Sequence, residues 1–127
     1  MTNETPIEIK RGDICYVNFG DCSDEKVGSE QSGMRPALII QNNKGNRYSP
    51  TTIVVPITSQ LGKKRLPMHV FIKGCKENGL KRDSIILCEQ FQTIDKKRIV
   101  DKIGSVDDDG CIMEDVKKAA FVSLGFW

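Results

Sequence analysis

The chain has 127 residues, which is the length of one ordinary domain. Hydrophobic residues make up 39% and charged residues 28%, a balance that excludes a disordered chain and a membrane protein built of apolar helices. No apolar run approaches the roughly 20 residues that cross a bilayer, and residues 1–9 contain no basic residue, which argues against a secretory signal peptide. We therefore expect a cytoplasmic protein with no membrane partner.

The formal net charge of +2 is distributed unevenly along the chain. Residues 44–98 hold 12 Lys or Arg against 4 Asp or Glu, whereas residues 99–127 hold 3 against 6. A basic middle segment attracts polyanions such as nucleic acid. An ordinary solvated, lysine-rich surface explains the same charges, so charge alone does not assign a partner.

Residues 1–9 are expected to form a short flexible lead-in, and residues 10–127 a single domain. β-Branched and aromatic residues predict a first strand at 14–19, followed by a polar loop at 20–33 that is too long for a tight hairpin. Residues 42–50 have the composition of turns and are predicted to form another loop. Apolar runs predict the remaining strands, at 36–41, 52–58, 69–72, 84–91 and 99–103.

Two further patterns complete the fold prediction. Proline cannot donate a hydrogen bond to a β ladder, so the strand that contains Pro56 is expected to have an edge or a bulge there. After three aspartates, apolar residues recur at gaps of three and four and predict a terminal helix. These residues are Met113, Val116, Ala120, Leu124 and Trp127. The pattern predicts a mainly β fold with a C-terminal α-helix, a small and partly open β-barrel on which the helix packs.

Residues with catalytic or ligand-binding chemistry are few. The five cysteines are odd in number and widely spaced, and the chain has one histidine. We therefore expect neither a zinc site nor another metal or cofactor, and we expect the thiols to be reduced. A Cys–His nucleophilic pair with His69 has no local support. Arg35 is followed by Pro36, which restricts Arg35 to extended conformations, and Thr58 ends the proline-interrupted strand. Propensity alone gives no reason to pair Arg35 with Thr58.

Six segments, in order, resemble the MazF/PemK toxin family and especially its Gram-positive branch. They span residues 10–14, 28–42, 45–51, 55–58, 66–70 and 83–95. The similarity covers roughly residues 10–127 and is weakest in the terminal helix. It implies an SH3-like or CcdB-like barrel with a C-terminal helix, in agreement with the strand pattern. In that family the arginine before the proline and the threonine that ends the next strand form the catalytic pair, and they match Arg35 and Thr58.

The resemblance implies a sequence-specific, metal-independent endoribonuclease toxin of a type II toxin–antitoxin system, which cleaves single-stranded RNA. The 2′-hydroxyl of the RNA is the nucleophile, and the products carry 2′,3′-cyclic phosphate and 5′-hydroxyl ends. We expect Arg35 to stabilise the phosphorane and Thr58 to donate a hydrogen bond to it. Other polar residues are candidates for contacts with RNA, although each has an ordinary structural role as its alternative. They are Arg11, Glu30, Gln31, Asn46, His69, Ser84, Glu89 and Gln90.

The resemblance also implies partners and leaves two rivals. Family members are homodimers, and each is silenced by a cognate MazE-like antitoxin with an acidic, flexible tail. The same barrel serves CcdB-like toxins, which bind DNA gyrase and cleave nothing, and an inactive RNA-binding module is a third possibility. The loop between the first two strands is longer here than the family pattern because of residues 21–26, which affects the expected RNA specificity rather than the catalytic pair.

Overall fold

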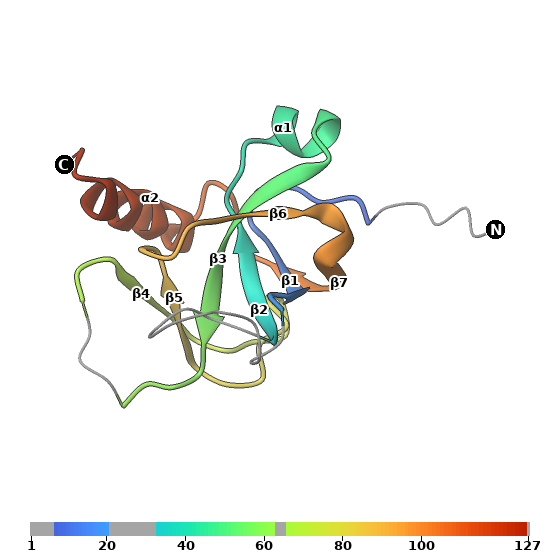
Figure 1. Cartoon of the computed structure of the whole chain (residues 1–127). Helices are drawn as coiled ribbons and strands as arrows, with labels where there is room; N and C mark the ends of the chain where they lie inside the picture. Colours follow the sequence, from blue (N-terminus) through green and yellow to red (C-terminus); the bar gives the residue numbers. More distant parts are fainter. Residues whose placement is uncertain (1–6, 21–32, 63–65, 127) are drawn as a thin grey trace.

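The computed structural model describes residues 7–20, 33–62 and 66–126. In these ranges seven antiparallel strands form one curled sheet in the order β4-β5-β3-β2-β1-β7, with β6 paired to β3, and helix α2 packs on the sheet at its β4 side (Figure 1). The strands are β1 Asp13–Asn18, β2 Met34–Ile39, β3 Thr51–Thr58, β4 His69–Ile72, β5 Ser84–Leu87, β6 Gln92–Asp95 and β7 Ile99–Ser105. The helices are α1 Asn43–Tyr48, the 3₁₀ helix η1 Lys96–Arg98 and α2 Cys111–Leu124. The predicted mainly β fold with a C-terminal helix is confirmed.

Strand β3 lies at the centre of the sheet and changes partner at Pro56. On one side it pairs with β2, where Pro56 lies opposite Ala37. On the other side its first half pairs with β6 as far as Val54, and its last two residues pair with β5 from Ile57 onward. Pro56 therefore lies between the two partner strands on that side, where its missing N–H interrupts no ladder. The expected interruption is present as this change of partner.

The sheet buries a separate apolar cluster on each of its faces. Alternation along β2 assigns Leu38 to the cluster beneath α2, and Ala37 and Ile39 to the opposite cluster. Helix α2 contributes Met113 and Val116 to the first cluster. Full burial of an aliphatic side chain of this size stabilises the fold by about 1.5–3 kcal/mol. These contacts, rather than helix propensity, hold α2 on the sheet.

Residues 42–50, predicted to form a loop, contain helix α1, and that prediction was wrong. The Asn42 side chain accepts a hydrogen bond from the Gly45 N–H at 2.8 Å and thereby caps the N-terminus of the helix. The Ser49 N–H donates to the Gly45 carbonyl at 2.8 Å and closes the last turn. Asn and Gly are common in turns, so composition alone indicated a loop.

Two boundaries also differ from the prediction. The strand expected at 84–91 ends at Leu87 in a turn closed by the Gln90 N–H, which donates to the Leu87 carbonyl at 3.1 Å, and β6 follows as a strand that was not predicted. In α2, Ala119 rather than Ala120 faces the core, and Leu124 is exposed. Trp127 lies outside the described residues.

Burial limits the reactivity of two thiols. It raises the pKa of Cys15 and of Cys88 to about 12, so both stay protonated near neutral pH. Cys75 and Cys111 are exposed, and Cys22 lies outside the described residues.

Ile9 is buried in the cluster that faces away from α2, so the packed domain includes this residue. No helix in the described ranges is long and apolar enough to span a membrane.

Candidate active site

Arg35 and Thr58 lie on neighbouring strands at the same end of the sheet. The ladder between β2 and β3 pairs Ile39 with Val54 and ends where Ala37 pairs with Pro56. If this antiparallel register is continued by two residues, Arg35 lies opposite Thr58. The two side chains also share a face by alternation, because Ala37 and Val54 both belong to the cluster that faces away from α2. The fold therefore places two residues that are 23 positions apart in the chain on the same face and at the same end of neighbouring strands.

Different strands support the two residues. Arg35 is half-buried and pairs with Val17 of β1, while Thr58 is half-buried and pairs with Ile85 of β5. The Thr58 hydroxyl oxygen accepts a hydrogen bond from the Gln60 N–H at 3.2 Å. That contact orients the hydroxyl and leaves its proton available to an acceptor such as a phosphate oxygen.

His69 and Glu89 form a hydrogen-bonded pair beside this end of the sheet. Phe71 of β4 pairs with Ile85, which itself pairs with Thr58, so Phe71 shares the face of Thr58. His69, two residues before Phe71, lies on the same face by alternation. Phe71 was predicted only as a strand residue, yet its exposed ring lies in the row of Thr58. Whether a strand residue such as Phe71 is exposed depends on how neighbouring strands cover it, and the sequence alone does not indicate how they pack.

The hydrogen bonds of His69 assign its tautomer. The Leu66 N–H donates to Nδ1 at 3.3 Å, so Nδ1 is the acceptor and the proton of a neutral ring is on Nε2. Nε2 lies 3.1 Å from Oε2 of Glu89 and donates to it. The other carboxylate oxygen of Glu89, Oε1, is buried and has no hydrogen-bond partner among the described residues. A buried acceptor without a donor is costly, and a ligand N–H would satisfy it.

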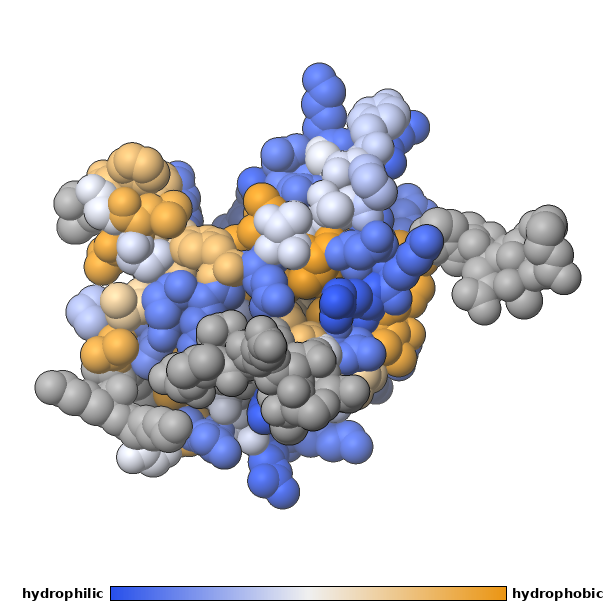
Figure 2. All heavy atoms as spheres, viewed as in Figure 1, coloured by the Kyte–Doolittle hydropathy of each residue, from blue (hydrophilic) through white to orange (hydrophobic). Residues whose placement is uncertain are grey.

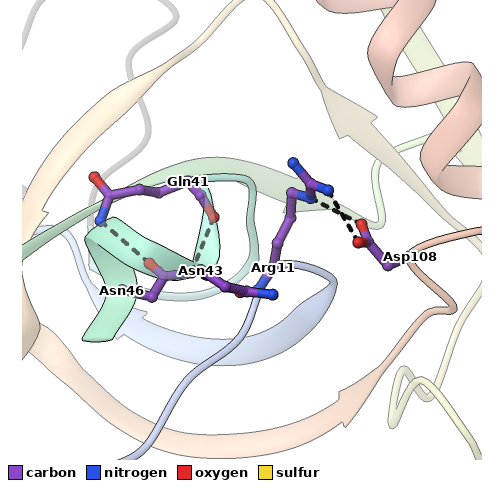
Figure 3. A network of polar contacts seen from close by, with 5 residues as sticks. All are labelled: Arg11, Gln41, Asn43, Asn46 and Asp108. Carbon is purple, nitrogen blue, oxygen red and sulfur yellow. Dashed lines mark hydrogen bonds and ion pairs between the residues drawn. The ribbon is translucent and has the colours of Figure 1, made fainter. Parts of the chain in front are cut away.

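Arg11 lies at the opposite end of β2, where the chain enters β1, and its side chain points toward Asp108 (Figure 3). Its guanidinium donates to both carboxylate oxygens of Asp108, at 2.8 and 2.9 Å. The hydrogen bond to Asp108 raises the pKa of Arg11, and the same bond lowers the pKa of Asp108. This candidate RNA contact is thus engaged by a carboxylate, and the fold does not bring it to Arg35 and Thr58.

Asn46 is also remote from the pair, and its side chain is only 4% exposed. Its carbonyl oxygen accepts from the Thr52 hydroxyl at 2.7 Å and from the Gln41 amide at 3.2 Å, and its amide donates to the Gln41 carbonyl at 2.9 Å (Figure 3). These bonds tie α1 to β3. Ser84 is buried as well, and its hydroxyl donates to the Arg82 carbonyl at 2.9 Å. The polar groups of Asn46 and Ser84 are therefore occupied inside the protein.

The remaining candidates fall on two segments. Gln90 directly follows Glu89 and is half-buried. Glu30 and Gln31 lie outside the described residues. No group of three or more His, Cys, Asp or Glu in the described ranges is arranged to hold a metal ion.

Solved structures share this fold. The crystal structure of MazF from Deinococcus radiodurans has a TM-score of 0.73 and 21% sequence identity and covers 94% of this chain and 98% of that chain. A mycobacterial endoribonuclease in complex with its cognate antitoxin has a TM-score of 0.71 and 22% identity, with 94% and 97% covered. At these identities the likeness shows the fold alone.

The sequence comparison is more specific than the fold. The family model of the PemK-like, MazF-like toxins of type II toxin–antitoxin systems matches residues 10–122. Endoribonuclease EndoA of Bacillus subtilis (strain 168) is 53% identical over 116 residues, which are 91% of this chain and 94% of that protein. The chain belongs to the PemK-like, MazF-like toxin family, and the resemblance seen in its motifs is confirmed.

Proposed function

We propose that this chain is the endoribonuclease toxin of a type II toxin–antitoxin system and that it cleaves single-stranded RNA at specific sequences in the cytoplasm, without a metal. The observation that carries the proposal is the position of Arg35 and Thr58, which share one face and one end of two neighbouring strands. The 53% identity to an endoribonuclease supports the same activity and disfavours the gyrase-binding alternative, for which fold was the only argument.

Arg35 and Thr58 suit a reaction in which RNA supplies its own nucleophile. The 2′-hydroxyl loses its proton to a base, its oxygen bonds to phosphorus, and the bond from phosphorus to the 5′-oxygen breaks as that oxygen gains a proton. The products are a 2′,3′-cyclic phosphate and a 5′-hydroxyl. The planar guanidinium of Arg35 stays charged and offers two parallel donors to the phosphorane oxygens, while the Thr58 hydroxyl donates a third hydrogen bond.

His69 and Glu89 are proposed to bind the RNA beside the cleaved phosphate. His69 holds Oε2 of Glu89, and a base that binds here must first displace the groups that cover Oε1, which then accepts its hydrogen bond. The exposed ring of Phe71 offers a surface on which a base stacks. Glu30, Gln31 and Gln90 remain proposed RNA contacts on the strength of the family resemblance alone. We leave Arg11, Asn46 and Ser84 out of this site because their polar groups are engaged elsewhere.

The last turn of α2 supports the proposed homodimer. Phe121 and Leu124 are exposed in this turn, Phe126 just beyond the helix is 78% exposed, and apolar side chains gather over α2 in Figure 2. An exposed apolar patch on a small protein is typically covered by a partner, and we propose a second copy of this chain. A Phe126→Ser variant is expected to weaken the dimer in sedimentation experiments. We also propose an antitoxin with an acidic, flexible tail, and mixing the toxin with such an antitoxin should abolish RNA cleavage.

Incubation of the purified protein with a long single-stranded RNA in EDTA tests the proposal. We expect cuts at a short repeated motif. Arg35→Ala should lower kcat by about 10³-fold or more, as expected for loss of a charged donor to a transferring phosphoryl group. Arg35→Lys is the matched control, because it keeps the charge and loses the planar fork; it should recover only part of the rate. A folded wild-type protein that cuts no RNA of diverse sequence would refute the enzyme and restore the gyrase alternative.

A further inference from the structure

A broad groove lies at the end of the domain where β3 begins, at the opposite end of that strand from Thr58. Its volume is about 1530 Å³. The N-terminal segment, α1 with the residues that follow it, η1 and the start of β7 form its walls. This region includes none of the residues proposed above for cleavage.

The charge of the groove is strongly positive. Its lining holds five cationic side chains and one carboxylate, that of Glu8. The cations are Lys10, Lys44, Arg47, Lys96 and Lys97. The ammonium group of Lys96 donates to the main-chain carbonyl of Asn46 and fixes η1 against α1, whereas the other four cations are exposed. Hydrophilic side chains gather over α1 in Figure 2. Such a field attracts a polyanion and increases its rate of capture.

An exposed aromatic ring lies among these charges. The side chain of Tyr48 is 73% exposed, and the guanidinium carbon of Arg47 lies 5.5 Å from the centroid of its ring. Exposed Ile7 and Val100 add apolar surface to the same groove. A basic groove with an aromatic ring on which bases stack is the usual surface for single-stranded nucleic acid.

We propose that this basic groove is a second RNA-binding surface, which holds the substrate several nucleotides away from the cleaved phosphate. The inference rests on the proposed nuclease function. The eight residues of β3 span about 23 Å at a rise of about 3.3 Å per residue. An RNA strand that reaches from Thr58 to the groove therefore includes several nucleotides on one side of the cleaved phosphate. An acidic peptide would match the charges, but it would leave the ring of Tyr48 and its paired guanidinium without a stacking partner.

Binding of a fluorescent 24-nucleotide poly(2′-O-methyluridine) tests the groove directly. This probe cannot be cleaved, because its 2′-oxygens are methylated. The triple variant Lys44→Gln, Arg47→Gln, Lys97→Gln is expected to bind it about tenfold more weakly. The slope of log K against log salt should fall by about 2, since each lost phosphate contact with a single strand contributes about 0.7. The control variant Lys73→Gln, Lys76→Gln, Lys81→Gln removes the same charge from exposed positions outside the groove and should leave both values near wild type.

The aromatic ring is tested separately from the charges. Tyr48→Ala should weaken binding of the same probe by about tenfold, while Tyr48→Phe should bind like wild type, because stacking needs the ring and not the hydroxyl. Equal binding by Tyr48→Ala and wild type would remove the ring from the site.

Cleavage provides a second measurement. In the groove triple variant, the ratio of kcat/KM for a long RNA to that for a short RNA with the same cut site should fall about tenfold, and in the control variant it should not change. Equal losses of affinity in the two triple variants would overturn the proposal. So would a groove variant that binds the probe normally and instead loses binding of an oligoglutamate peptide. If the groove variant loses binding but the wild-type protein cuts no RNA, only the proposed nuclease function is refuted. If the wild-type protein cuts RNA but the groove variant binds the probe normally, only the proposed second RNA-binding surface is refuted.

Discussion

The buried amide of Asn46 supports a quantitative prediction. Asn46→Ala removes its hydrogen bonds with the Thr52 hydroxyl at 2.7 Å, the Gln41 amide at 3.2 Å and the Gln41 carbonyl at 2.9 Å. Thr52 is fully buried, so its hydroxyl loses its partner where water cannot replace it. One buried polar group left unsatisfied costs about 1–3 kcal/mol, and the half-buried Gln41 groups add to this. We expect a loss of about 3 kcal/mol, which corresponds to a fall in Tm of about 10 °C for a domain of this size.

Urea unfolding of wild type, Asn46→Ala and Thr52→Val measures this loss. All proteins are compared at one concentration, because the chain is proposed to dimerise. The double variant should be less destabilised than the sum of the two single variants, since removing both partners leaves no orphaned hydroxyl. Lys44→Ala, at an exposed position of α1, is the control for the unfolding measurement. A loss below about 1 kcal/mol together with much weaker RNA binding would refute the structural role and return Asn46 to the RNA-binding site.

Three further predictions concern other residues. Thr58→Val should lower kcat by about 100-fold while Thr58→Ser keeps most of the rate, because the donated hydrogen bond needs the hydroxyl and not the methyl group; equal rates would exclude the hydroxyl from catalysis. Gly79→Ala should cost more than about 2 kcal/mol in urea unfolding, because φ is +74° and an added Cβ would lie 2.0 Å from a carbonyl oxygen of β7. Gly33→Ala is the comparison, because its φ of +76° is similar but the space around it is open; it should cost only about 1 kcal/mol. The lowered pKa of Asp108 means that its ion pair with Arg11 stabilises the fold above the ordinary carboxyl pKa and is lost as pH falls through the lowered one. Asp108→Asn should therefore cost less than about 1 kcal/mol at pH 7, because both side chains are about 40% exposed, and this cost should disappear once the pH is below the lowered pKa of Asp108.

Most strands were predictable because they consist of apolar, β-branched runs that are buried whatever their neighbours are. Strand β6 was missed because only Ile94 of its four residues is buried, so no apolar run marks it. Helix α1 was missed because it depends on a cap from Asn42, a residue that is equally common in turns. Both errors concern segments that no apolar run marks in the sequence.

The candidate site was predictable in part. Arg35 and Thr58 came from the family resemblance, and their shared face follows from a register that only the folded sheet provides. The hydrogen bonds that engage Arg11 and Asn46 join residues that composition gives no reason to pair, so their RNA-binding role looked as plausible as that of His69. The basic groove combines the N-terminal segment with η1, about 90 positions later, and no local pattern indicates that association.

The early end of the β2–β3 ladder has a consequence for how the catalytic geometry is set. Beyond Ala37 and Pro56, Arg35 is supported from β1 by Val17, and Thr58 is supported from β5 by Ile85. The guanidinium of Arg35 and the hydroxyl of Thr58 therefore lie at the ends of two strands, β2 and β3, that are supported by different neighbouring strands. We expect a substitution in the packing under β5 to displace the Thr58 hydroxyl more than the Arg35 guanidinium. Substitutions in the core can therefore change the distance between the two groups without changing either reacting side chain.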